Sequence, residues 1–171
     1  LMAAAEFILA TQQWGSKELE TSVTPTVSKS GTTTNTVPDL AEVHVDVRAW
    51  DRTEQERIDQ VVRGFTSTLP VEIEIIGGID RPAMEAAMSA ELFTLAQHLN
   101  RKLGYPDLTE CAVGGASDGN LTAAAGILTI DGMGAAGDGA HADFEWASAS
   151  AMPHRAELLE KMLIELIAEN Y

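Results

Sequence analysis

The 171-residue chain carries 26 acidic and 11 basic residues, a formal net charge of −15, and 45% of its residues are hydrophobic. That hydrophobic share supports a packed core, and the length suits one ordinary domain or two small ones. The scarcity of Lys and Arg argues against binding to nucleic acid or to an anionic membrane surface, because both need a basic face. The single cysteine, Cys111, excludes an internal disulfide and a zinc–thiolate cluster.

The sequence shows neither a membrane span nor a secretory signal. No apolar run approaches the roughly 18 residues of a membrane span, and the start lacks the basic segment of a secretory signal. We therefore expect a cytoplasmic protein. Residues 2–14 predict a helix that ends at Gly15, yet no capping residue precedes it. A chain cut from a longer protein and a frayed terminus both account for this start.

The first half of the chain alternates strand and helix patterns. Residues 21–30 and 41–49 are typical of strands, with Pro25 at an edge. Thr53 opens a capping box before an amphipathic helix, and residues 71–75 alternate like a third strand. The order helix–strand–strand–helix–strand matches a ferredoxin-like split β-α-β unit whose first strand is absent.

The second half is rich in glycine. Residues 89–103 and 153–169 predict helices, and 112–113 and 127–130 predict short strands. Eight of the fourteen glycines lie between Gly114 and Gly139. This half reads as a piece of an α/β layer, with the boundary near residues 79–85.

The first glycine cluster, residues 114–120, follows a predicted strand and precedes a helical run. Its amides at a helix start suit an anion or carboxylate. The alternative is a tight turn in which Ser117 or Asp118 caps the helix. The spacing fits neither a dinucleotide-binding nor a P-loop motif.

His141 ends the second glycine cluster, which begins at Asp131. Neutral imidazole is the commonest metal ligand, so His141 is a candidate ligand, and a loop histidine is the alternative. The other three histidines, His44, His98 and His154, are expected on the surface. Cys111 is expected to pack within a strand rather than to act as a nucleophile.

Two arginines stand out because cations are scarce. Arg48 lies on the polar face of a predicted strand, and Arg81 precedes a proline at the predicted domain boundary. A guanidinium matches a carboxylate in shape and charge. The alternative for each is a surface ion pair.

The order of these motifs resembles the C-terminal half of the dizinc exopeptidase and deacylase family. That family includes glutamate carboxypeptidase, acetylornithine deacetylase, succinyl-diaminopimelate desuccinylase and aminoacylase. The motifs that carry the resemblance are Asn35-Thr36-Val37-Pro38, Asp46-Val47-Arg48, Arg81-Pro82, the cluster at 114–120, and Asp131-Gly132-Met133-Gly134 through Gly139-Ala140-His141.

The resemblance implies an α/β fold of two partial domains. Residues 1–80 correspond to an incomplete ferredoxin-like dimerisation lid, and residues 81–171 to the C-terminal portion of a zinc-exopeptidase α/β catalytic domain. A homodimer through the lid is implied. The implied substrate is a small molecule or peptide with a free carboxylate, and the implied cofactor is a pair of zinc ions.

The same resemblance implies roles for individual residues. His141 matches a zinc ligand. The substrate-binding residues it implies are Asn35, Arg48, Arg81, Gly115 and Ser117. The family's other zinc ligands, its bridging aspartate and its glutamate base have no match in this sequence, so no catalytic residue is assigned. We therefore expect part of a zinc-dependent carboxypeptidase or amidohydrolase, inactive by itself. The alternative is a non-catalytic dimerisation or carboxylate-binding module.

Overall fold

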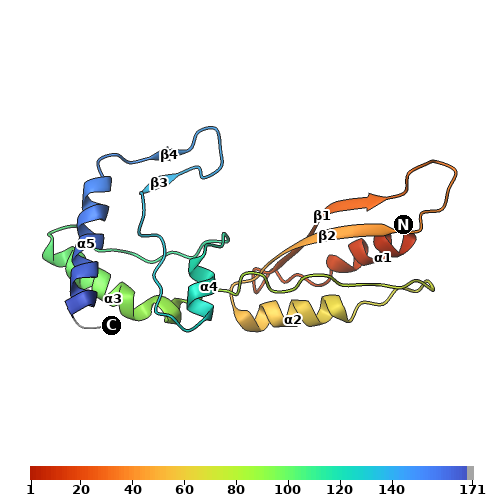
Figure 1. Ribbon diagram of the computed structural model, residues 1–171, viewed down its shortest axis with the longest axis horizontal. Helices are drawn as coiled ribbons and strands as arrows, with labels where there is room; N and C mark the ends of the chain where they lie inside the picture. Colours follow the sequence, from red (N-terminus) through yellow and green to blue (C-terminus); the bar gives the residue numbers. More distant parts are fainter. Residues whose placement is uncertain (169–171) are drawn as a thin grey trace. The chain divides into compact units, whose positions relative to one another are not determined.

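Two units make up the chain in this computed structural model, which describes residues 1–168 (Figure 1). Unit 1 comprises residues 1–84 together with 114–116. Unit 2 comprises residues 85–113 and the chain from Ser117 onward. Each unit mixes helices with a two-stranded antiparallel sheet, so the mixed α/β class predicted from the sequence is confirmed. No described helix is long and apolar enough to cross a membrane.

The sheet of unit 1 consists of β1 (Ser22–Ser30) and β2 (Ala41–Arg48), as the alternation of residues predicts. Ser22 pairs with Arg48 at one end and Ser30 with Ala41 at the other. The register shifts between Pro25 and Val27. A proline has no N–H to donate to a strand ladder, and a local irregularity on an edge strand accommodates this.

Helix α1 (Met2–Thr11) contacts both strands. It ends three residues before the end of the predicted helix at residues 2–14. Its Phe7 ring packs edge-on against Trp14 and Phe65, with ring centroids 5.3 and 5.1 Å away. Such edge-to-face aromatic contacts add to the energy of burial. This trio joins α1 to the end of the second helix.

Helix α2 (Arg52–Arg63) contacts β2 and buries Ile58. Asp51, not Thr53, caps it: the Asp51 carboxylate accepts from the Glu54 amide at 2.8 Å. The predicted capping box is wrong because Thr53 already lies inside the first turn. The buried Glu54 carboxylate lies 2.6 Å from the Arg57 guanidinium, which holds the pKa of Glu54 below its ordinary value.

The strand predicted at residues 71–75 is not formed. Within the described chain, residues 71–79 pair with no strand, although the ribbon follows an extended course there (Figure 1). In Figure 1 this segment runs in the same direction as β2. The alternation of Val71, Ile73 and Ile75 with glutamates suits a strand, but a strand needs a partner with which to exchange hydrogen bonds.

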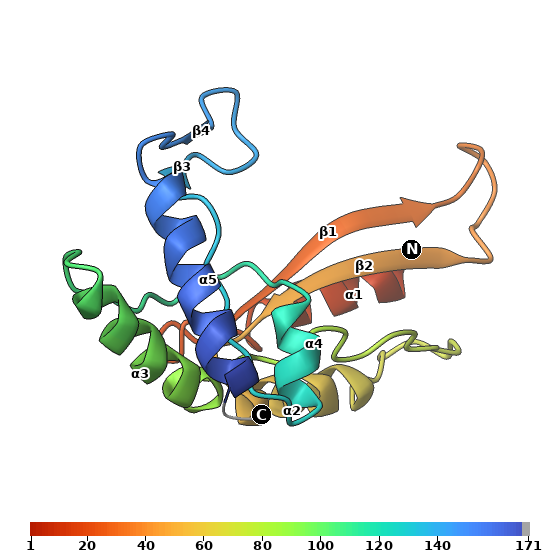
Figure 2. The ribbon, with the colours of Figure 1, turned by 60° about the vertical axis from the view of Figure 1, so that its left-hand side comes forward.

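In unit 2, α3 (Ala86–Lys102) packs against α5 (Met152–Ala168) (Figure 2). The core between them consists of Leu92, Ala96, Leu99, Leu158 and Met162. On α3 these residues recur at three- and four-residue intervals, the spacing of one helix face. Both helices therefore form where the sequence predicts them. The last position of the predicted final helix, Glu169, lies outside the described residues.

Between those helices the chain is largely irregular. It contains α4 (Gly119–Ala124) and a hairpin of β3 (Gly137–Asp138) with β4 (Trp146–Ala147). The strands predicted at 112–113 and 127–130 are not formed, and Cys111 is exposed rather than packed. Short apolar runs specify a strand only where a neighbouring strand completes the ladder.

His154 departs from its predicted surface position. Its ring stacks on Tyr105, with centroids 3.6 Å apart, and its Nε2 lies 2.6 Å from Asn100 Oδ1. Asn100 is fully buried, and its amide nitrogen donates to the Pro106 carbonyl. This polar link ties the start of α5 to the end of α3.

Candidate functional site

Arg81 is held in place through its backbone. The Gln55 side chain, on α2, donates to the Arg81 carbonyl and accepts from the Ala83 amide, both at 2.9 Å. The guanidinium of Arg81 is 39% exposed and lies 4.0 Å from an Asp80 carboxylate oxygen. Its backbone is therefore fixed while part of the side chain stays open to solvent, as a residue that binds an anion requires.

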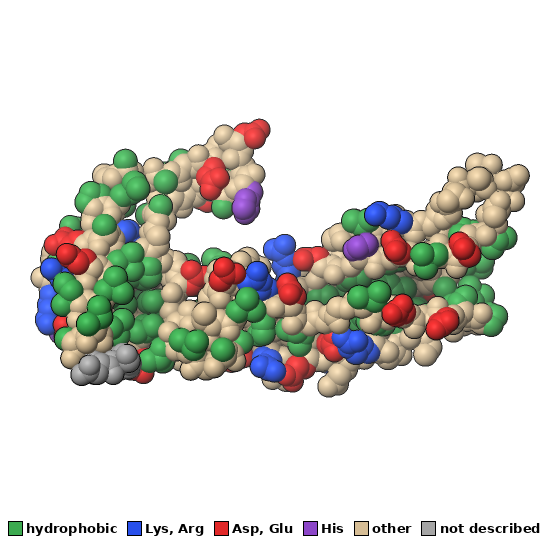
Figure 3. Space-filling model, in the orientation of Figure 1, with side chains coloured by type: hydrophobic (Ala, Val, Ile, Leu, Met, Phe, Trp, Pro, Cys, Tyr) green, Lys and Arg blue, Asp and Glu red, His purple; other side chains and the backbone are tan. Residues whose placement is uncertain are grey.

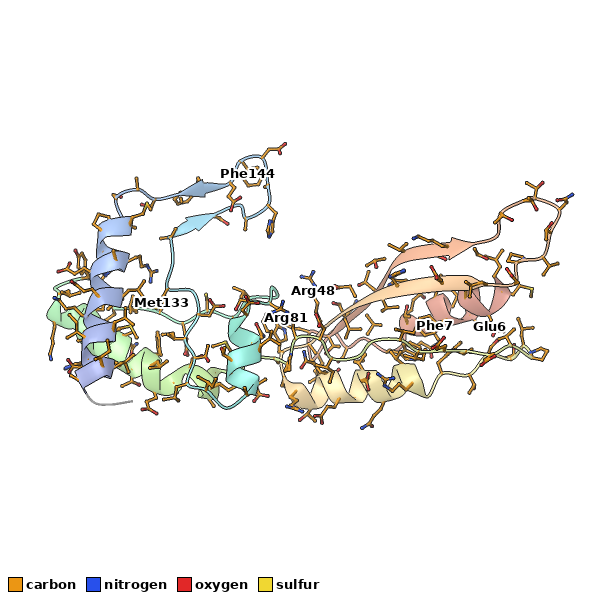
Figure 4. The ribbon with its side chains drawn as sticks, in the orientation of Figure 1. Glu6, Phe7, Arg48, Arg81, Met133 and Phe144 are labelled. Carbon is orange, nitrogen blue, oxygen red and sulfur yellow. The ribbon has the colours of Figure 1, made fainter. Side chains whose placement is uncertain are left out.

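Arg48 lies at the end of β2, and Figure 4 draws it at the same end of unit 1 as Arg81. Its Nε is 2.9 Å from Asp46 Oδ2, and its Nη1 donates to the Gly114 carbonyl at 3.5 Å. The structure thus brings Arg48 close to the predicted Gly115. A Cβ added at Gly115 meets no atom within 4 Å, so the loop is open at that position.

Asn35 lies at the opposite end of unit 1, in the loop between β1 and β2. It lines a pocket of about 620 Å³ whose other walls include α1 residues, Leu69 and Val71. The eight residues of β2 separate this loop from Arg48, which is roughly 25 Å at about 3.3 Å per residue. Within one unit 1, therefore, Asn35 and Arg48 do not meet on one small substrate.

Ser117 lies in unit 2, where its hydroxyl is already engaged. Its Oγ donates to Asp131 Oδ2 at 2.6 Å and accepts from the Gly119 amide at 3.0 Å. These bonds form a tight turn before α4, the alternative that the sequence analysis gave for residues 114–120. Hydrogen bonds from Ser117 and then from the Gly132 amide hold the pKa of Asp131 below its ordinary value.

His141 lies in the loop of the β3–β4 hairpin and is exposed. Its backbone is left-handed, with φ of +68°, which is uncommon for a residue other than glycine. Nearby Gly139 also has a positive φ, and a Cβ there would lie 2.9 Å from the Phe144 ring. In this turn His141 is exposed to solvent.

A zinc site needs about three protein ligands in one place. Among residues 1–168, no group of three His, Cys, Asp or Glu side chains is placed to hold a metal ion. The described residues do not fit a complete metal centre. His141 is at most one ligand of such a centre.

Two residues that support the site escaped the sequence analysis. Gln55 holds the Arg81 backbone, and Asp131 holds the Ser117 hydroxyl. Asp131 belongs to a recognised motif, yet spacing alone gives it no role. Nothing in the sequence marks Gln55, because its partners are backbone atoms that lie 26 and 28 positions away.

On the face that Figure 3 draws, Lys and Arg side chains are scattered rather than gathered in one patch. Figure 3 shows acidic side chains spread over both units, with exposed hydrophobic side chains between them. This agrees with the net charge of −15. Exposed apolar residues of unit 2 include Val113, Ile127, Phe144, Trp146 and Ile167.

Comparisons with known proteins give two matches. Residues 1–74 match the family model described as the peptidase dimerisation domain. Carboxypeptidase G2 of Pseudomonas sp. (strain RS-16) is 27% identical over 177 aligned positions, which cover 97% of this chain. The chain spans 41% of that relative's length. Together these matches confirm the predicted resemblance to a carboxypeptidase-like family, and the match to the dimerisation domain lies in the first half of the chain.

Proposed function

From this peptidase resemblance, we propose that the chain is part of a metal-dependent carboxypeptidase or amidohydrolase that cleaves an amide bond beside a free carboxylate. Residues 1–80 act as the dimerisation lid, and residues 81–171 as the C-terminal portion of the catalytic domain. The observation that carries the proposal is the peptidase dimerisation match over residues 1–74, joined to a carboxypeptidase alignment along nearly the whole chain. A cytoplasmic location stays a prediction.

Arg81 is the residue we assign to the substrate carboxylate. Gln55 fixes its backbone, and the guanidinium is partly exposed. A guanidinium and a carboxylate form two parallel charge-assisted hydrogen bonds. Arg48 and the loop at Gly115 belong to the same unit as Arg81. Arg48 adds positive charge, and the loop at Gly115 leaves open space. The resemblance also assigns Ser117 to substrate binding; in this structure its hydroxyl donates to Asp131.

Asn35 contacts substrate only in a homodimer under this proposal. It lies at the far end of β2 from Arg48, so one subunit's lid does not bring both residues to one ligand. A dimer formed through the lid allows Asn35 of the partner subunit to reach a site that the first subunit's Arg81 lines. The need for two lids gives the dimerisation domain a direct role in substrate binding.

Zinc is the metal we propose, with His141 as one ligand. When bound, zinc activates water for attack on an amide carbonyl. The described residues supply neither the remaining ligands nor a general base. We therefore propose that this chain is inactive by itself and that the metal centre is completed by polypeptide beyond these 171 residues.

The decisive experiment has two arms. The chain alone is dialysed against zinc and assayed with N-acyl amino acids; we expect no turnover and fewer than two bound ions. A chimera in which this chain replaces the aligned segment of carboxypeptidase G2 is then assayed in the same way. There we expect His141→Ala to lower activity by at least about 100-fold, whereas the exposed His98→Ala leaves it unchanged. Turnover with a stoichiometric zinc pair in the chain alone contradicts the proposal.

The chimera also tests the carboxylate site. Arg81→Ala should raise KM for substrates with a free carboxylate by roughly 10- to 100-fold, the value of a charged hydrogen-bonded pair. Substrates whose carboxylate is amidated serve as the control, and their KM should not change. An equal effect on both substrates removes Arg81 from this role.

A non-catalytic dimerisation module is the second candidate. The match over residues 1–74 favours it, because that match concerns dimerisation alone. The two candidates differ in the chimera: a module that lost its catalytic role gives no activity there, although it still associates.

A further inference from the structure

The turn at residues 117–120 satisfies its own backbone amides. The Ser117 amide donates to the Asn120 side-chain oxygen at 2.9 Å, and the Gly119 amide donates to the Ser117 hydroxyl oxygen at 3.0 Å. The next two amides, those of Asn120 and Leu121, donate to backbone carbonyls of the same turn at 3.2 and 3.0 Å. Each of these four amides already has an acceptor, so the turn does not offer them to an anion. What the turn presents to a ligand is therefore its side chains.

Asp131 braces this turn from the segment that follows α4. The Ser117 hydroxyl donates to Asp131 Oδ2 at 2.6 Å, a length typical of a hydroxyl bonded to an ionised carboxylate. The other carboxylate oxygen, Oδ1, accepts from the Gly132 amide at 2.7 Å. The hydrogen bond from Ser117, and then that from Gly132, keep the pKa of Asp131 below its ordinary value. An ionised carboxylate only accepts, so the proton between the two side chains belongs to Ser117.

The core of unit 2 fixes the backbone that carries Asp131. Ile130 and Met133, which flank it in the sequence, pack against the buried cluster of α3 and α5. A second bridge joins the same two stretches of chain, because the Thr122 hydroxyl of α4 lies 2.9 Å from the Thr129 hydroxyl. Asp131 is thus tied to the core of the unit, and the hydroxyl that it holds takes its position from that core.

The direction of the shared proton decides what Ser117 offers to a ligand. A serine hydroxyl has a single proton, and here Asp131 accepts it. A carboxylate also only accepts, so a substrate carboxylate does not suit a hydroxyl whose proton is already used. Toward a substrate, Ser117 acts as an acceptor, and its partner is a hydrogen-bond donor such as an amide N–H or a hydroxyl. This chemistry is the opposite of the anion binding that a glycine-rich turn before a helix suggests.

We propose that Asp131 is a positioning residue of the substrate site, which holds the Ser117 hydroxyl so that its oxygen accepts a hydrogen bond from the substrate. The inference rests on the proposed function, because the substrate role of Ser117 comes from the resemblance. Asp131 does not touch the substrate and acts through Ser117. Its replacement should therefore cost the substrate about one neutral hydrogen bond, a rise in KM of roughly 3- to 10-fold.

The first arm of the test uses the 171-residue chain and nuclear magnetic resonance. The exchange of the Ser117 hydroxyl proton is followed through the deuterium isotope shift of its Cβ, and hydrogen exchange is followed at the Gly119 amide. Asp131→Ala should speed both exchanges by roughly tenfold or more, because the acceptor that orders the hydroxyl is gone. Asp107→Ala is the matched control, since it removes an exposed carboxylate elsewhere in unit 2 and should leave both rates unchanged.

The second arm uses the chimera with carboxypeptidase G2 and N-acyl amino acids as substrates. Asp131→Ala and Ser117→Ala should each raise KM by roughly 3- to 10-fold and change kcat by less than about twofold. The double variant S117A/D131A should raise KM no further than Ser117→Ala alone, because Asp131 acts through Ser117. Asp131→Asn keeps an acceptor oxygen without the charge and should raise KM by less than Asp131→Ala does.

Substrates with an amidated carboxylate separate this role from that of Arg81. Asp131→Ala should raise KM equally for the free and the amidated substrate, whereas Arg81→Ala should affect the free carboxylate alone. A chimera that turns over substrate while Asp131→Ala leaves KM unchanged overturns the inference and leaves the proposed function standing. Additive effects of the two replacements, or an effect confined to free carboxylates, overturn it likewise. A chimera without turnover contradicts the proposed function, and the inference falls with it.

Discussion

The Gln55 side-chain amide donates to the Arg81 carbonyl at 2.9 Å, while its oxygen accepts from the Ala83 amide at the same distance. One glutamine on α2 therefore fixes the chain on both sides of Pro82. Pro82 itself has no N–H to donate. The Gln55 side chain supplies hydrogen-bond partners to the backbone groups on either side of it. The position of the proposed carboxylate-binding arginine thus depends on a residue of α2.

Replacing Gln55 with alanine should loosen residues 81–84. Two hydrogen bonds are lost and two partly buried backbone groups lose their partners, so we expect a loss of about 1–2 kcal/mol in unfolding free energy. Urea unfolding measures the loss, and hydrogen exchange at Ala83 should be faster. Gln60→Ala, exposed on the same helix, is the control and should change stability by less than about 0.5 kcal/mol.

In unit 1, the strands whose partners lie nearby in the sequence were predicted correctly. β1 and β2 pair across a short loop, and their alternation predicts both strands. Residues 71–75 carry an equally clear alternation but form no strand, because the pattern does not reveal whether a partner is present. The capping residue of α2 was misassigned because Asp51 and Thr53 both suit that position, and only the geometry distinguishes them.

In unit 2 the buried polar link between α3 and α5 escaped prediction. Asn100 and His154 are 54 residues apart, and neither lies in a motif. Asn100 donates from its amide nitrogen to the Pro106 carbonyl, which only accepts. Its Oδ1 must therefore face His154, and the Nε2 of His154 must carry a proton.

Nuclear magnetic resonance of the imidazole nitrogens should show that the neutral His154 ring carries its proton on Nε2. Asn100→Ala removes the two hydrogen bonds of a fully buried side chain, one to His154 and one to the Pro106 carbonyl, so we expect a loss of about 1–3 kcal/mol in unfolding free energy. Thr94→Ala on the exposed side of α3 is the control. A His154 ring protonated only at Nδ1 contradicts the assignment.

Ser117→Ala should raise the pKa of Asp131 toward its ordinary value. The Ser117 hydroxyl is the larger cause of the lowered pKa, and the Gly132 amide is the smaller one. A carboxyl with a lowered pKa in the folded chain stabilises the fold above its ordinary pKa, and this contribution is lost as the pH falls through the lower folded value. The variant should therefore lose less stability on acidification than the parent chain does.

A carbon-detected titration of the Asp131 carboxyl measures the shift, and urea unfolding at neutral and acidic pH measures the stability. Ser150→Ala serves as the control because its hydroxyl contacts Ser148 and not Asp131. If Asp131 titrates identically in the Ser117 variant and the parent, the hydrogen bond at 2.6 Å does not hold in solution.

The geometry around His141 also lay beyond sequence reasoning. A glycine-rich stretch predicts a loop, but not which of its residues adopts a left-handed backbone. Here His141 does so, and Gly139 approaches the Phe144 ring so closely that a Cβ has no room. Both positions lie in the same hairpin loop, but a side chain at position 139 would meet the Phe144 ring, whereas position 141 already carries one.

This difference gives the last prediction. Gly139→Ala should destabilise the hairpin by about 1–2 kcal/mol, because alanine is strained at φ of +75° and meets the ring. His141→Gly should be neutral or slightly stabilising, since glycine adopts the left-handed region readily. Hydrogen exchange at the Ala142 and Glu145 amides, which bond to Gly139 and Ala142 within the loop, measures both effects. Equal protection in the two variants would contradict this difference between the two positions.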